Sequence, residues 1–72
     1  MTPAPEERLA ANLRKQRRAA KLSQEQLSAK AGLHPTEISR LERAVRDPRL
    51  STIVSVARGL GVTAEQLVAG IR

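Results

Sequence analysis

Hydrophobic residues recur along most of the chain at the three- and four-residue spacing of an amphipathic helix. Leu9 and Leu13 begin the first such stripe, and charged residues occupy the rest of the turn. Pro5 suits the first position of a helix, and the two glutamates that follow it suit the positive end of the helix dipole. These features predict a first helix over residues 5–21, after a flexible tail over residues 1–4.

Capping signals mark the start of a short second helix. Ser23 is a good N-cap, and Gln26 stands three residues later, as in a capping box. Gly32 suits the left-handed residue that ends many helices. We therefore expect a second helix over residues 24–31.

A third helix is predicted immediately afterwards. Pro35 suits its first position, which makes His34 the N-cap. Ile38 and Leu41 then face inward at helical spacing and leave a polar outer face. The predicted range is 35–43.

Two further helices follow a polar connection. A hydrophobic stripe predicts a helix over residues 50–60, ended by Gly61. Its members are Leu50, Ile53, Val54, Ala57 and Leu60. Thr63 repeats the capping-box pattern and begins a last helix over residues 63–70. No strand signal occurs, so the sequence predicts one all-α domain over residues 5–72.

Composition narrows the function of such a domain. The 72 residues carry 13 Lys and Arg against seven Asp and Glu, a net charge of +6. This excess favours a polyanionic partner, nucleic acid or an acidic membrane surface, although a merely soluble basic protein has the same charge. There is no Cys and only one His, so we expect no disulfide and no metal. No nucleophile and base are arranged together, so we expect neither an enzyme nor a cofactor.

The chain also lacks the signals of a membrane or secreted protein. No apolar run approaches the ~20 residues of a membrane span, and the acidic, Pro-rich start is unlike a signal peptide. We therefore expect a cytoplasmic protein, associated with the bacterial nucleoid through its function, with no membrane partner.

The segment from Ser23 to Arg43 carries the functional signal. It predicts two short helices around a tight Gly-Leu-His turn, and the second helix exposes small polar residues and two arginines. A major groove admits one α-helix of this kind. Arg40 can reach a base edge or a phosphate, and the unpaired N–H groups at the start of the second helix can bind a phosphate.

Several stretches of the chain together resemble the Xre family, which includes Cro and the phage repressors. They are Leu22-Ser23-Gln24-Glu25-Gln26-Leu27, Ala31-Gly32-Leu33, Ile38-Ser39-Arg40-Leu41-Glu42-Arg43 and Pro48-x-Leu50. The resemblance covers roughly residues 8–70. It implies a compact five-helix bundle of the lambda-repressor type, with the helix-turn-helix at 24–43, and a sequence-specific transcriptional regulator that binds double-stranded DNA.

The resemblance and the segment pattern together assign roles to individual residues. We expect base contacts from Pro35, Thr36 and Arg40. We expect phosphate contacts from Ser23, Gln24, Ser39, Arg43, Arg14, Arg18 and His34. The resemblance further implies a structural ion pair between Arg17 and Glu42, which would bridge the first and third helices.

Two positions depart from the family pattern. Ala44 stands where the family usually has Gly, so either Ala44 is left-handed at a cost of roughly 1 kcal/mol or the third helix runs on by a turn. Pro35 cannot donate a hydrogen bond, so it can read a base only by contact, for example with a thymine methyl group.

We expect a homodimer that binds a roughly palindromic operator. Val68 and Ile71 are the candidates for its interface, because the last predicted helix is short and is the last element of the sequence, so that we expect one of them to be partly exposed. Two other classes remain open: a protein-interaction module on the same fold, and a membrane-surface helical domain. Within the regulator class, the sequence leaves a restriction–modification controller, an antitoxin and a stand-alone regulator open.

Overall fold

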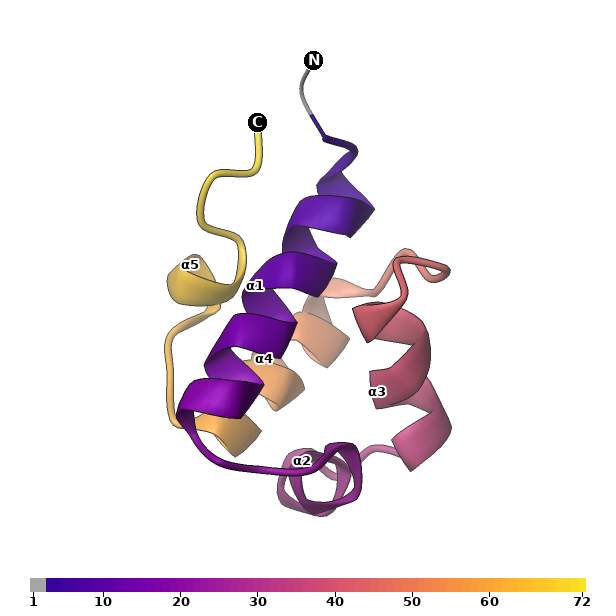
Figure 1. The fold of residues 1–72 in the computed structure, drawn as a ribbon, viewed down its shortest axis with the longest axis vertical. Helices are drawn as coiled ribbons and strands as arrows, with labels where there is room; N and C mark the ends of the chain where they lie inside the picture. The colour runs from indigo at the N-terminus through magenta and orange to yellow at the C-terminus, as the bar shows by residue number, and fades with distance from the viewer. Residues whose placement is uncertain (1–2) are drawn as a thin grey trace.

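The computed structural model describes residues 3–72, and all regular secondary structure in that range is helical (Figure 1). The helices are α1 (Pro5–Ala19), α2 (Gln24–Ala31), α3 (Pro35–Glu42), α4 (Leu50–Leu60) and α5 (Ala64–Leu67). α1 lies between α3 and α5, α2 crosses at one end, and α4 packs on α2 and α5. The predicted all-α fold is confirmed. Of the predicted tail, residues 1–2 lie outside the described range, and Pro3 and Ala4 precede α1 in non-helical conformations.

Side-chain caps set the starts of α2, α3 and α5, whereas α1 and α4 begin without a side-chain cap hydrogen bond. In α2 the Ser23 hydroxyl oxygen accepts from the Gln26 N–H at 3.0 Å, and the Gln26 side chain accepts from the Ser23 N–H at 2.8 Å. Thr63 and Gln66 form the same capping box before α5. At α3 the cap is His34, whose Nδ1 accepts from the Thr36 N–H at 3.1 Å. These bonds satisfy N–H groups that have no partner within the helix.

Two helices end earlier than predicted because the chain turns at left-handed residues that are not glycine. Lys21 has φ of 58°, and the following Leu22 N–H donates to the Arg17 carbonyl at 3.2 Å. α1 therefore ends at Ala19 rather than near residue 21. Ala44 has φ of 59°, so α3 ends at Glu42. Of the two alternatives for Ala44, the left-handed one holds, and the helix does not run on.

Helix α5 is four residues long, shorter than the predicted 63–70. Thr63 is its cap rather than its first residue. At the other end, the Asn12 side-chain amide donates to the carbonyls of Leu67 and Ala69, each at 2.8 Å. Gly70 then turns left-handed at φ of 78°. A side chain from α1 thus holds the turn that follows α5.

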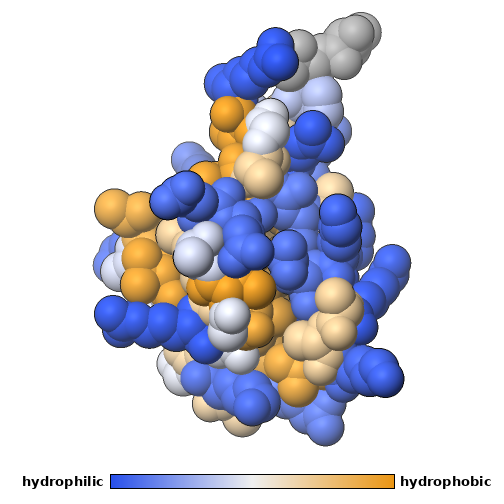
Figure 2. Space-filling model, turned by 90° about the vertical axis from the view of Figure 1, so that its left-hand side faces the viewer, coloured by the Kyte–Doolittle hydropathy of each residue, from blue (hydrophilic) through white to orange (hydrophobic). Residues whose placement is uncertain are grey.

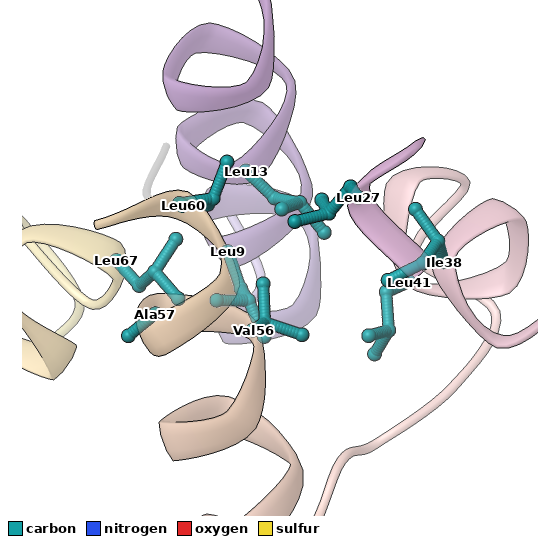
Figure 3. Packing of buried hydrophobic residues seen from close by; sticks show 9 residues of the cluster. All are labelled: Leu9, Leu13, Leu27, Ile38, Leu41, Val56, Ala57, Leu60 and Leu67. Atoms are coloured by element: carbon teal, nitrogen blue, oxygen red, sulfur yellow. The ribbon is translucent and has the colours of Figure 1, made fainter. Parts of the chain in front are cut away.

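The core is aliphatic and lies where α1, α2, α3, α4 and α5 meet (Figure 3). It consists of Leu9, Leu13, Leu27, Ile38, Leu41, Val56, Ala57, Leu60 and Leu67. Leu50, the first member of the predicted hydrophobic stripe of α4, lies outside this core, with its side chain 73% exposed. α2 packs close to the far end of α4, where a Cβ on Gly59 would lie 3.0 Å from the Ala31 nitrogen. α2 therefore covers the C-terminal end of α4, and the first turn of α4, which holds Leu50, lies outside this contact.

None of the helices in the described range is long and apolar enough to cross a bilayer.

Candidate nucleic-acid interface

Helix α3 has two faces of opposite character. Ile38 and Glu42 are 0% and 4% exposed and point into the bundle. Thr36, Arg40 and Arg43 are exposed on the other side of the helix. Within residues 3–72, the side chains of Thr36 and Arg40 make no hydrogen bond. The outer face therefore has donors and charge available for a partner.

The inner face of α3 is fixed by an ion pair at its last residue. Arg17 of α1 approaches Glu42 in bidentate geometry, with Nε 2.5 Å from Oε2 and Nη2 3.0 Å from Oε1. A third nitrogen, Nη1, donates to the Leu22 carbonyl at 2.9 Å. The Glu42 hydrogen bond raises the pKa of the Arg17 guanidinium above its ordinary value, against the opposing effect of burial. The arginine stays charged, and the partners that the resemblance implied lie in contact.

Glu42 also binds two further side chains. Nε2 of Gln24, the first residue of α2, donates to Oε1 at 3.1 Å. Nη1 of Arg14, from α1, donates to the Glu42 backbone carbonyl at 2.5 Å. One buried residue thus ties α1, α2 and α3 together. We call Glu42, Arg17, Gln24 and Arg14 the Glu42 network.

This network changes how two predicted phosphate contacts can act. The side-chain amide of Gln24 donates inward, so its backbone N–H is the group left at the start of α2. Arg14 is half-buried and has one guanidinium nitrogen engaged with α3. Arg18, by contrast, is exposed. The three residues therefore differ in their freedom to reach a phosphate.

The remaining predicted contacts lie at the ends and outer side of the two helices. Ser23 and His34 are exposed caps, so the atoms left for a partner are the Ser23 hydroxyl hydrogen and the His34 Nε2. Pro35 and Ser39 are half-buried, and the Ser39 carbonyl accepts from Arg43 Nε at 3.3 Å. All four belong to the surface formed by α3 and the start of α2.

A groove of about 500 Å³ follows the outer side of α3 and was not predicted from the sequence. Arg40 lines one wall, and Arg46 and Arg49 from the connection to α4 line the other. The sequence signal that could have indicated this wall is the pair of arginines on either side of Asp47-Pro48, directly after the third helix. With these residues the groove carries three guanidinium groups.

Val68 and Ile71, the predicted interface residues, lie away from this surface. Both are half-buried beside the start of α1 and line a second groove. The described residues contain no group of three or more His, Cys, Asp or Glu side chains that could hold a metal ion.

Comparison with known proteins identifies the arrangement. A helix-turn-helix family model matches residues 13–67. The uncharacterized HTH-type transcriptional regulator y4dL of Sinorhizobium fredii is 44% identical over 54 residues, which cover 75% of this chain and 28% of that protein. The control protein C.SmaI of Serratia marcescens is 42% identical over 60 residues, 83% of this chain and 71% of that protein. The chain thus spans less than a third of the first relative and most of the second.

Solved structures show the same fold. The hypothetical transcription factor NHTF from Neisseria has a TM-score of 0.87 and 37% identity, over 94% of this chain and 82% of that one. The restriction-modification controller protein C.AhdI from Aeromonas hydrophila has a TM-score of 0.84 and 31% identity, over 86% of this chain and 94% of that one.

Proposed function

Because this chain belongs to the Xre-like helix-turn-helix family of DNA-binding transcriptional regulators, we propose that it is a homodimer that reads a roughly palindromic operator with α3. The observation that carries the proposal is the division of α3 into an anchored inner face and an unengaged outer face. A helix held from behind can enter a major groove without giving up its own contacts.

Base reading is assigned to the exposed residues near the middle and start of α3. Arg40 can donate two hydrogen bonds to a guanine edge, which is the commonest specific contact in major grooves. Thr36 can meet a base edge through its hydroxyl or methyl group, and Pro35 can contribute only an apolar contact. Thr36 and Arg40 are exposed and make no hydrogen bond to other described side chains, whereas Pro35 is half-buried.

Phosphate contacts are assigned to the groups around that helix. The start of α2 offers the backbone N–H of Gln24 and the hydroxyl of Ser23. Arg43, Ser39, His34, Arg18 and Arg14 are retained from the predicted set. We add Arg46 and Arg49, because they line the groove beside Arg40. Such contacts position the protein and make its affinity strongly dependent on salt.

A two-fold dimer would place its α3 helices in successive major grooves. The two half-sites would then lie about one helical turn apart, on the order of 34 Å. Among the possible regulatory roles, we favour a controller, because C.SmaI and C.AhdI carry that description in their names and match most of this chain.

Selection of bound sequences from a random DNA pool tests the proposal. We expect enrichment of a roughly palindromic site with half-sites about 10 base pairs apart. Enrichment of a single half-site would contradict the dimer, and no enrichment would contradict sequence-specific binding.

The salt dependence of retention on random duplex DNA separates this function from a protein-interaction module of the same fold. A DNA-binding domain loses affinity steeply as salt rises. Retention that is absent at low salt would favour the interaction module.

A further inference from the structure

Glu37 places a negative charge on the surface that is proposed to meet DNA. It lies in the first turn of α3, three residues before Arg40, and both side chains are exposed. Both also line the groove beside α3. Because DNA is a polyanion, a carboxylate on this surface opposes binding unless it meets a hydrogen-bond donor of the DNA. The contacts assigned to α3 so far do not use this carboxylate.

The cap of α3 does not use the Glu37 carboxylate either. In α2 and α5 the third residue is Gln26 or Gln66, and its side chain accepts from the backbone N–H of the N-cap residue. Glu37 stands at the same third position of α3, yet within residues 3–72 its side chain makes no hydrogen bond. Its charge favours the positive end of the helix dipole, and that effect leaves both oxygens free to accept.

The arginines of the groove also leave this carboxylate unpaired. Arg40, Arg46 and Arg49 line the groove, but among the described residues the one ion pair joins Arg17 to Glu42 elsewhere. A glutamate and an arginine at i and i+3 can pair across one helical turn. Since they do not pair here, the outer face of α3 presents a free acceptor in its first turn and a free donor in its second.

We infer that Glu37 reads a cytosine of the operator by accepting a hydrogen bond from the cytosine N4 amino group. In the major groove only cytosine N4 and adenine N6 donate, and the other polar atoms of the base edges are acceptors. Adenine carries the N7 acceptor beside its amino group, and that lone pair repels a carboxylate. Cytosine carries no such acceptor on its major-groove edge, so a carboxylate favours it. This inference rests on the proposed function and adds one base to the operator.

The spacing on α3 places this cytosine beside the base that Arg40 reads. Residues three apart in an α-helix are separated by about 4.5 Å along its axis, and successive base pairs by about 3.4 Å. Glu37 and Arg40 therefore address neighbouring base pairs, with guanine as the base for Arg40. On other sequences the carboxylate faces acceptors and phosphates without a donor, so it also lowers the affinity for random DNA.

Selection from a random DNA pool with the Glu37→Gln variant tests the base assignment. The guanine is identified as the base that Arg40→Ala no longer selects. We expect the wild-type chain to select cytosine beside it. Glu37→Gln should select adenine at that position and leave the other positions unchanged, because glutamine can bind adenine N6 and N7 together.

Affinities for two operators measure the same preference. When the cytosine–guanine pair is replaced by an adenine–thymine pair, we expect the wild-type affinity to fall roughly 5- to 150-fold. The Glu37→Gln variant should bind the changed operator more tightly than the original one.

Glu65→Gln is the matched control for charge. It removes the same negative charge from an exposed position of α5, which lies on the other side of α1 from α3 (Figure 1). The face that carries α5 is mainly hydrophilic with hydrophobic patches (Figure 2), and Glu65 does not line the groove beside α3. We expect Glu65→Gln to select the wild-type sequence. The affinity for random duplex DNA should rise more in Glu37→Gln than in Glu65→Gln. Circular dichroism should show both variants folded.

The outcomes separate this contact from the proposed function. If the wild-type chain and Glu37→Gln select the same base at every position, the contact is overturned and base reading by α3 stands. A changed base in the Glu65→Gln selection would trace the effect to net charge and overturn the contact as well. A wild-type chain that selects no sequence contradicts the proposed function itself.

Discussion

Each of the two faces of α3 carries a charged side chain, and the two side chains are used in opposite ways. On the inner face, Glu42 is buried and accepts hydrogen bonds from Arg17 and Gln24. On the outer face, Arg40 is exposed and makes no hydrogen bond within the described residues. A charged side chain inside the bundle is completely partnered, and one on the surface is left without a partner.

This difference shows how a small domain can hold one helix in a fixed position while the residues on the outer face of that helix stay free to bind a partner. The bundle lacks aromatic residues and disulfides, so the position of α3 depends on aliphatic packing and on the Glu42 network. Polar groups of the inner face hold the last residue of the helix to α1 and α2. Residues of the outer face can then differ between relatives without loss of the fold. Four predictions test this division.

Replacing Glu42 with Ala should have the largest effect on stability. The Arg17 guanidinium would lose its partner, with its side chain only 15% exposed. We expect a loss of about 3–5 kcal/mol in the free energy of unfolding, measured by urea denaturation.

The matched control is Glu37→Ala, on the exposed side of the same helix. Its stability should change by less than about 0.5 kcal/mol. Equal losses in the two variants would show that α3 is not anchored through its inner face.

Replacing Gln24 with Ala should have an intermediate effect. It removes one hydrogen bond to Glu42 and leaves both contacts from Arg17. We expect a loss of about 1.5 kcal/mol, typical of a hydrogen bond to a charged group. The double variant with Glu42→Ala should lose less than the sum of the two, because both changes act on one interaction. Additive losses would place Gln24 outside the network.

Replacing Ala44 with Gly should stabilise the protein. Ala44 is left-handed, with φ of 59°, and glycine adopts that conformation without the clash of a Cβ atom. We expect a gain of up to about 1 kcal/mol, which raises Tm by roughly 4–8 °C in a domain of this size. The same substitution at Ala11, exposed within α1, should destabilise by a similar amount. A loss of stability in Ala44→Gly would argue against the left-handed end of α3.

The sequence was sufficient to predict the capped helix starts and the two helix ends at Gly32 and Gly61, but not the ends that lack a glycine. Ser23 and His34 act within three residues of their partners, so local spacing reveals them. Lys21 and Ala44 turn left-handed without glycine, and such turns depend on packing around them. Leu50 belongs to the predicted stripe of α4 and yet is exposed, because periodicity gives the direction of a side chain and not how far the neighbouring helix extends.

In the site, too, features set by local spacing could be predicted and features set by packing could not. The outer residues of α3 follow from helical spacing and the family resemblance. The contacts from Gln24 and Arg14 to Glu42 join residues 18 and 28 positions apart, and no local pattern contains them. Asn12, which holds the turn after α5 from 55 residues away, was missed for the same reason.

The central claim is that the outer face of α3 reads bases, and the Arg40→Ala variant tests it most directly. Its stability should change by less than about 0.5 kcal/mol, because Arg40 is exposed. The decisive quantity is the ratio of affinities for the selected operator and for random duplex DNA at one salt concentration, with Arg18→Ala as the phosphate-contact control. We predict that the ratio falls by about 5- to 150-fold in Arg40→Ala, corresponding to ~1–3 kcal/mol, and stays unchanged in Arg18→Ala. An unchanged ratio in Arg40→Ala, with both affinities reduced alike, would contradict the assignment.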